Sequence, residues 1–284
     1  MAEYIYFLYK YTPVRHKTAR TAASALRQYW NEQAIDYVPR QKSIISRILS
    51  GYQELKPSET RPSRPFSIFH FKKLLHLKLI NSFSYCGKLQ TAALSIGYFW
   101  GARVGEYAAN SKEDWPWILH RGDLDLYYSE NRLKSIVIDF KKHKANRWGL
   151  WNAKIAVNCS CNIGICGIHL LYQFVKIRDK EFGKDPNLPL LLQLKGVPML
   201  QTHMRNLMKN IAEALELNPK FYVPHSLRAG RCTDLKRAKK PNWAIKKWGR
   251  WRSDCWMDYY LKLDPSDIAK LSNLSMNELG FQDN

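Results

Sequence analysis

The sequence predicts a mainly α-helical protein that carries one small antiparallel β-sheet. Between residues 17 and 33, apolar side chains recur every three or four positions, as they do on an amphipathic helix. Residues 124–128 and 135–140 instead form short apolar or β-branched runs bounded by turn residues, which is typical of a β-hairpin. Three prolines within 57–65 interrupt the helical patterns, so we expect a linker there.

This linker predicts two domains. A chain of 284 residues is long enough for two modest domains. We expect a short helical domain over 1–56, a linker over 57–65 and a larger domain over 66–284. In the first domain, a second amphipathic pattern spans 40–50, and Gly51 is the expected helix cap.

The larger domain mixes helical and strand patterns. Apolar stripes over 66–79 and 89–110 predict two helices, the second interrupted near two glycines. The pattern over 202–215 predicts another helix with Met and Leu on its core face. A third strand is expected over 151–157, beside the hairpin.

The charge of the chain indicates a polyanionic partner. Lys and Arg number 45 against 24 Asp and Glu, which gives a formal net charge of +21. This excess suits a DNA backbone, where each neutralised phosphate releases a counterion. No run approaches the roughly 20 apolar residues of a membrane span, and the N-terminus lacks a secretory-signal pattern. We therefore expect an intracellular protein, nuclear if its source is eukaryotic, with no membrane partner and with its six cysteines as thiols.

Three ordered motifs near the C-terminal end carry the candidate chemistry. Pro224 is a helix-start signal, so His225 and Arg228 present an imidazole and a guanidinium on one face of a first helical turn. Gly249-Arg250-Trp251 follows, and Tyr259-Tyr260 comes about one short helix later. A His-x-x-Arg pair alone is weak evidence, but three motifs in this order are hard to obtain by chance.

This order of motifs resembles the C-terminal box of tyrosine recombinases, the phage-integrase and Cre family. It is most similar to the eukaryotic Crypton-type branch, where Gly-Arg-Trp replaces the more common Gly-His. Gly101-Ala102-Arg103-Val104-Gly105-Glu106 resembles the first box of the family. The resemblance implies a tyrosine-recombinase catalytic domain, preceded by a short helical core-binding domain that clamps DNA.

The resemblance also implies a role for each site residue. Arg103 and Arg228 would bind the non-bridging phosphate oxygens and stabilise the transition state. Lys144 would protonate the departing 5′ oxygen, and His225 would contact the phosphate or assist deprotonation of the nucleophile. Trp251 would replace the second family histidine and donate its indole N–H to the phosphate.

Two of these assignments leave alternatives open. In the family, a lysine at the start of a β-hairpin turn enters the minor groove; alignment favours Lys144 over Lys142 and Lys141. The nucleophile would be a tyrosine. Spacing from the Gly-Arg-Trp motif favours Tyr260 over Tyr259, whereas ungapped comparison with eukaryotic members favours Tyr259.

One cluster of residues indicates a possible metal site. Cys159, Cys161, Cys166 and His169 offer four zinc-competent ligands within eleven residues. Their spacing is not one of the usual zinc pairs, and the residues around them are apolar. We therefore favour structural thiols, and predict no metal or cofactor in the reaction.

The leading functional hypothesis is a site-specific DNA recombinase or integrase that mobilises a transposon or viral element. It would act through a 3′-phosphotyrosine intermediate, on double-stranded DNA, as a homo-tetramer with a dimer on each site. Two alternatives remain at this stage. One is a type IB topoisomerase, which would relax supercoils as a monomer. The other is a domesticated DNA-binding protein without catalysis.

Overall fold

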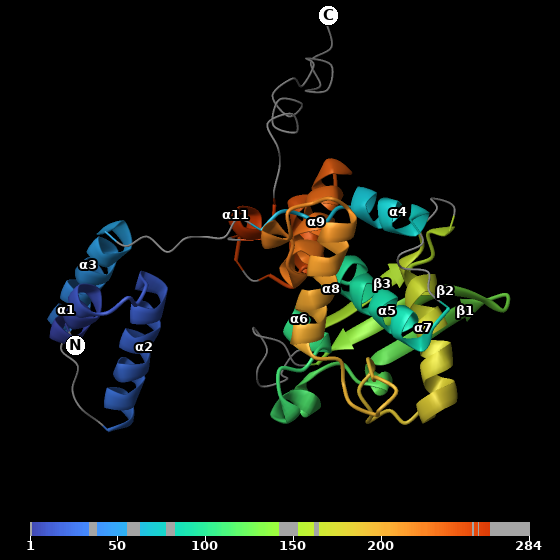
Figure 1. Ribbon diagram of the computed structural model, residues 1–284, viewed down its shortest axis with the longest axis horizontal. Coiled ribbons are helices and arrows are strands. Elements are labelled where there is room, and N and C mark those ends of the chain that lie inside the picture. The colour runs from blue at the N-terminus through green and yellow to red at the C-terminus, as the bar shows by residue number, and fades with distance from the viewer. Residues whose placement is uncertain are drawn as a thin grey trace, which may run out of the picture. The chain divides into compact units, whose positions relative to one another are not determined.

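The computed structural model describes residues 2–33, 39–55, 63–77, 83–141, 153–161, 165–251, 253–254 and 256–261. Within these residues the protein is mainly helical with one three-stranded antiparallel sheet, which confirms the predicted fold class (Figure 1). The chain forms two compact units, Met1–Arg61 and Pro62–Asn284. None of the described helices is both long and apolar enough to span a membrane.

The first unit contains α1 (Ala2–Tyr11), α2 (His16–Glu32) and α3 (Pro39–Leu55). These helices share a small core of their own, formed by Ile5, Leu8, Ala19, Ala23, Ile45 and Tyr52. The expected helix end at Gly51 is wrong, because α3 continues through it. Tyr52 explains the extra turn, since its ring is buried and its hydroxyl donates to the Val14 carbonyl.

The sheet of the second unit is a meander. Strands β1 (Leu124–Ser129), β2 (Arg132–Phe140) and β3 (Ala153–Asn158) pair in the order β1-β2-β3. Glu130 and Asn131 join the first two strands, and their φ angles are 49° and 60°. Two consecutive positive φ values give the two-residue turn whose twist matches that of the strands.

The helical elements of the second unit are α4 (Ile68–His76), α5 (Tyr85–Phe99), α6 (Val104–Tyr107), η1 (Lys112–Trp117), η2 (Arg121–Asp123), α7 (Gly167–Phe182), α8 (Gln201–Ala214), η4 (Pro219–Phe221), α9 (Pro224–Arg237), α10 (Asn242–Trp248) and α11 (Trp256–Tyr260). The helix expected over 89–110 therefore breaks after Phe99. Gly101 has a φ of 58° and lies against Trp248, where an added Cβ would come within 2.6 Å of the ring. The break places Arg103 at the start of α6.

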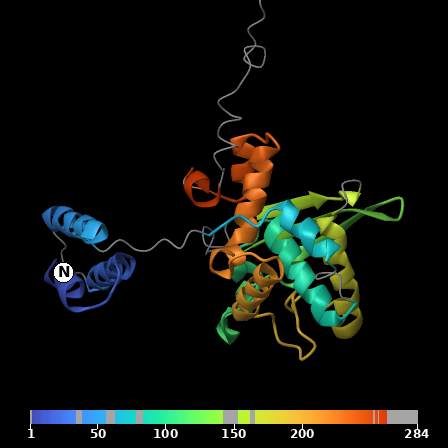
Figure 2. The same cartoon turned by 45° about the horizontal axis from the view of Figure 1, so that its top comes forward.

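Helix α5 is the centre of the second unit and packs against α7 and α9 (Figures 1 and 2). All its residues from Thr91 to Phe99 are buried. Asp234 fixes α9 in place, because its carboxylate accepts from the Ile68 backbone at 2.7 Å and from the Tyr98 hydroxyl of α5. These contacts hold α9 against α5 and the start of α4.

Candidate active site

His225 and Arg228 lie in the first turn of α9. Pro224 occupies the first helical position, where its missing N–H is not needed. Ser226 accepts the Val223 backbone N–H at 3.1 Å on its Oγ and so completes the cap. The two candidate side chains differ in environment, since His225 is exposed and Arg228 is completely buried.

Arg228 is held by two backbone carbonyls, one between α5 and α6 and the other at the C-terminal end of α10. Its Nη1 donates to the Gly101 carbonyl and its Nη2 donates to the Gly249 carbonyl. The guanidinium carbon lies 4.5 Å from the centroid of the Trp251 ring and 5.2 Å from that of the Tyr260 ring. The two rings therefore cover the charged group.

The Glu106 carboxylate gathers three arginines. It accepts from Arg103 Nη1 at 3.1 Å and from Arg250 Nη2 at 2.9 Å. Burial raises the pKa of Glu106, but the charges of Arg250, Arg228 and Arg103 outweigh burial and lower it. Burial, followed by the neighbouring Arg250 and Arg103, lowers the pKa of Arg228 to about 9, so its guanidinium is still charged at neutral pH. The cluster thus holds more positive than negative charge.

The turn after α10 brings two motif residues into this cluster. Arg250 adopts a left-handed backbone conformation, with a φ of 54°, and reaches Glu106. A Cβ at Gly249 would lie 1.8 Å from the Trp251 ring, so that position requires glycine. Gly-Arg-Trp is therefore one local unit that directs an arginine to Glu106 and an indole over Arg228.

Several buried donors of the cluster have no hydrogen-bond partner in the part of the chain that the structure describes. They are Nε of Arg228, Nε and Nη1 of Arg250, and Nε1 of Trp251. Buried N–H groups are almost always paired, and leaving one unpaired costs about 1–3 kcal/mol. Donors on guanidinium and indole groups at one place suit an oxyanion such as phosphate.

Tyr260 is the last residue of α11 and faces His225. Its Oη lies 3.2 Å from Nε2 of His225, and the two rings stack with their centroids 5.7 Å apart. The Tyr260 ring also lies 4.9 Å from Trp251, which stacks on Trp256. Trp251 and Trp256 thus support the Tyr260 ring, and the Tyr260 hydroxyl lies within hydrogen-bonding distance of the His225 imidazole. The side chain of Tyr259 lies outside the described residues.

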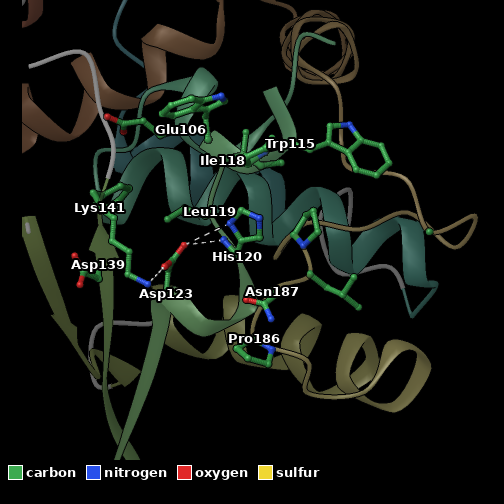
Figure 3. A pocket seen from close by; sticks show the side chains of 16 residues that line it. Glu106, Trp115, Ile118, Leu119, His120, Asp123, Asp139, Lys141, Pro186 and Asn187 are labelled. Atoms are coloured by element: carbon green, nitrogen blue, oxygen red, sulfur yellow. Dashed lines mark hydrogen bonds and ion pairs between the residues drawn. The ribbon is translucent and has the colours of Figure 1, made fainter. Parts of the chain in front are cut away.

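The structure describes one of the three predicted turn lysines. Lys144 and Lys142 lie outside the described residues. Lys141 lies at the end of β2, and its Nζ is 2.6 Å from Oδ1 of Asp123. This ion pair borders a pocket of about 560 Å³ that Glu106 also lines (Figure 3). The hydrogen bond to Asp123 raises the pKa of Lys141, so its charge is engaged with that carboxylate.

Glu106 and Arg250 belong to the cluster, although their positions in the sequence did not mark them as site residues. Glu106 follows Arg103 by three positions, and Arg250 is the middle residue of Gly-Arg-Trp. These places within two motifs are the signal in the sequence that could have marked them as site residues. Spacing could not show that both side chains meet, because that contact depends on the positive φ of Arg250 and on the break before α6.

Comparison with solved structures finds the same fold in DNA recombinases. The TM-score is 0.54 to the XerH site-specific recombinase bound to a palindromic difH substrate, at 15% identity, over 80% of this chain and 62% of that one. It is 0.53 to XerA recombinase, at 15% identity, over 87% of this chain and 80% of that one. It is 0.52 to the Tn1549 transposon integrase in complex with circular intermediate DNA, at 14% identity, over 96% of this chain and 83% of that one.

This chain thus spans less than two thirds of the XerH chain. No protein-family model and no curated protein matches the sequence. At these identities the likeness is one of fold, and the fold is that of a tyrosine-recombinase catalytic domain preceded by an N-terminal helical region.

Proposed function

We propose that this protein is a site-specific DNA recombinase or integrase that cleaves and rejoins DNA through a 3′-phosphotyrosine intermediate. One observation carries the proposal: Arg228 and Trp251, which both have an unpaired donor, lie beside Tyr260, whose hydroxyl faces His225. An oxyanion site beside a tyrosine hydroxyl is what transfer of a phosphoryl group to tyrosine requires. The net charge of +21 and the fold support the same proposal.

In the proposed reaction, the scissile phosphate binds at the arginine cluster. Arg103 would meet it first, because 19% of its side chain is exposed against 3% for Arg250. Reaching Arg228 requires the Trp251 and Tyr260 rings to move off its guanidinium, because they cover it. Binding would then satisfy the unpaired N–H groups and offset the excess positive charge.

Tyr260 Oη attacks phosphorus while the bond from phosphorus to the 5′ oxygen breaks. The phenolic proton passes to Nε2 of His225, which lies 3.2 Å away. The leaving 5′ oxygen takes a proton from Lys144, the role that the resemblance implies for it. The phosphotyrosine then holds the DNA end until a second 5′ hydroxyl attacks and the steps reverse.

The proposal extends to partners and assembly. Of the three similar structures named above, two hold DNA, namely the XerH difH complex and the Tn1549 integrase complex. By analogy we assign double-stranded DNA to this chain, with residues 1–56 as the DNA-clamping domain, 57–65 as linker and 66–284 as catalytic domain. A homo-tetramer with a dimer on each site would perform the exchange, in the nucleus if the source is eukaryotic.

A library of randomised DNA tests the proposal and finds the target sequence in the same experiment. The protein is incubated with nicked duplexes whose sequence around the nick is randomised, and DNA that stays attached in detergent is captured and sequenced. We expect an enriched sequence and strand exchange between two copies of it. Relaxation of a separate, covalently closed supercoiled plasmid without strand exchange would favour the topoisomerase. Specific binding with no detergent-resistant adduct would favour the non-catalytic binder.

A further inference from the structure

Four metal-ligating side chains converge outside the arginine cluster. Cys159 and Cys161 follow β3, Cys166 is the N-cap residue of α7, and His169 lies in the first turn of that helix. Their three Sγ atoms and the His169 ring nitrogen all lie within 4.8 Å of one another. Among the apolar neighbours that favoured plain thiols in the sequence, Ile165, Ile168 and Leu171 are buried in the core, whereas the four candidate ligands turn toward one point.

The distances among the four groups fit a tetrahedral metal site. Cys159 Sγ lies 3.3 Å from Cys161 Sγ and 3.8 Å from Cys166 Sγ. His169 Nδ1 lies 3.1 Å, 3.2 Å and 4.0 Å from the Sγ atoms of Cys166, Cys161 and Cys159. Tetrahedral zinc, with bonds of about 2.3 Å to sulfur and about 2.0 Å to nitrogen, has edges of about 3.8 Å between sulfurs and about 3.5 Å from sulfur to nitrogen. Small side-chain shifts suffice to admit the ion.

Backbone contacts fix the ligands in place. The Cys159 N–H donates to the Lys134 carbonyl of β2 at 2.7 Å. The Ser160 N–H donates to Cys166 Sγ at 3.3 Å, and its hydroxyl donates to the Ile165 carbonyl at 2.9 Å. An N–H directed at sulfur stabilises a thiolate, as outer-shell partners do in metal sites.

We propose that Cys159, Cys161, Cys166 and His169 bind one Zn²⁺ in a closed structural site. Three thiolates and an imidazole are ligands that zinc prefers and that Mg²⁺ and Ca²⁺ do not. Each thiol loses its proton to solvent as its sulfur binds, and His169 binds neutral through Nδ1. The complex carries one negative charge, and Lys134 lines the same surface hollow as Cys159, Cys161 and His169.

The zinc site fastens the sheet to α7, at the end of β2 that lies opposite Lys141. Asn158, the residue before Cys159, pairs with Ser135 near the start of β2, whereas Lys141 follows Phe140 at the other end of that strand. With four protein ligands, the ion has no open position for a substrate. The role of the ion is therefore structural. The zinc proposal does not rest on the proposed function.

Metal analysis of the full-length protein tests this inference. The protein is purified without added metal or chelator and desalted, and zinc is measured by mass spectrometry. We expect about one zinc per chain, and less than about a tenth as much in Cys161→Ser. Cys86→Ser is the matched control, because Cys86 is also exposed but lies outside the cluster. Equal zinc in the Cys161→Ser variant and the wild type would overturn the proposal.

Cobalt titration gives a second test that needs no variant. Wild-type protein is stripped with a chelator and titrated with Co²⁺, which takes the same ligands as zinc. We expect the strong visible bands of tetrahedral, thiolate-bound cobalt, saturating at about one equivalent and abolished by added Zn²⁺. The weak spectrum of octahedral cobalt throughout the titration would overturn the proposal. Neither readout involves DNA, so the proposed recombinase activity is tested separately.

Discussion

Arg228 shows how single residues build the candidate site. A guanidinium that is excluded from water interacts strongly with an anion, because little solvent screens it. Its two Nη atoms are committed to the carbonyls of Gly101 and Gly249, which orient the group before any ligand binds. Preorganised donors of this kind are what stabilise charge in a transition state. The same burial makes the arginine costly to replace.

Arg228→Lys is expected to reduce the rate of covalent adduct formation by at least about 100-fold, because a lysine cannot span both carbonyls and still meet the phosphate. DNA affinity should change little, since many other basic residues share the backbone contacts. Arg178→Lys is the matched control: Arg178 is equally buried and also donates to two backbone carbonyls, but it is not in the cluster. Equal loss of rate in both variants would contradict the role of Arg228.

Glu106→Gln is expected to lower the free energy of unfolding at pH 7 by about 3–5 kcal/mol, because three arginines lose their buried counter-charge. The pKa of Glu106 is lowered from its usual 4.5. Its contribution to stability is therefore complete above about pH 4.5 and is lost as the pH falls through the folded pKa. The difference between variant and wild type should narrow in acid.

Urea denaturation followed by tryptophan fluorescence at several pH values measures this effect. Glu213→Gln serves as the control, because Glu213 forms an exposed ion pair with Lys209 and should change stability by less than about 1 kcal/mol. A Glu106→Gln deficit that stayed constant with pH would show that the carboxylate charge is not the cause.

At the scale of elements, the placement of α9 decides where the site residues point. The Phe66 N–H donates to the Ser226 carbonyl at 2.8 Å, so the segment before α4 runs against the start of α9. Gly230 permits this approach, because a Cβ there would lie 1.9 Å from the Phe66 carbonyl oxygen. The obstacle is backbone, which cannot turn aside as a flexible side chain can.

Gly230→Ala is therefore expected to destabilise the protein by about 3 kcal/mol or more, as measured by chemical denaturation. Gly105→Ala is the control, because its nearest obstacle is the flexible end of Gln201 at 3.4 Å. That change should be neutral or stabilising by up to about 1 kcal/mol. A Gly230→Ala variant as stable as Gly105→Ala would contradict the packing of α9 described here.

The elements that the sequence predicts are those with a local cause. The hairpin and the amphipathic helices follow from periodicity, and the first turn of α9 follows from Pro224. The residue at which α5 ends, Phe99, could not be predicted, because this helix end depends on Trp248 packing over Gly101. The contact of Arg250 with Glu106 depends on the same tertiary arrangement.

At the scale of the whole molecule, the net charge of +21 predicts a strong dependence of DNA binding on salt. A chain with this excess should release many counterions when it binds a phosphate backbone. Affinity for a duplex should therefore fall by at least about 100-fold between 50 mM and 200 mM salt. Fluorescence anisotropy over a salt series measures it, and an affinity that barely changed would contradict an electrostatic interface.

Charge removal just after α9 tests whether this surface contributes to DNA binding. Replacing both Lys239 and Lys240 by Gln should reduce the slope of log affinity against log salt by up to about 2, because each phosphate contact contributes about 0.9. Lys180 and Lys184, near the end of α7, allow the same change of charge elsewhere and should leave the slope unaltered. Equal effects of the two double variants would point to net charge rather than to this surface.

The identity of the nucleophile tests the central claim most directly. A nicked duplex carrying the selected sequence traps the adduct, and peptide mass spectrometry then locates the DNA remnant on the protein. We predict that it lies on Tyr260, whose hydroxyl faces His225. Tyr260→Phe should form no adduct and Tyr259→Phe should form one, since phenylalanine lacks only the bond-forming oxygen. The reverse pattern would transfer the role to Tyr259, and an adduct that both single variants still form would contradict the covalent mechanism proposed here.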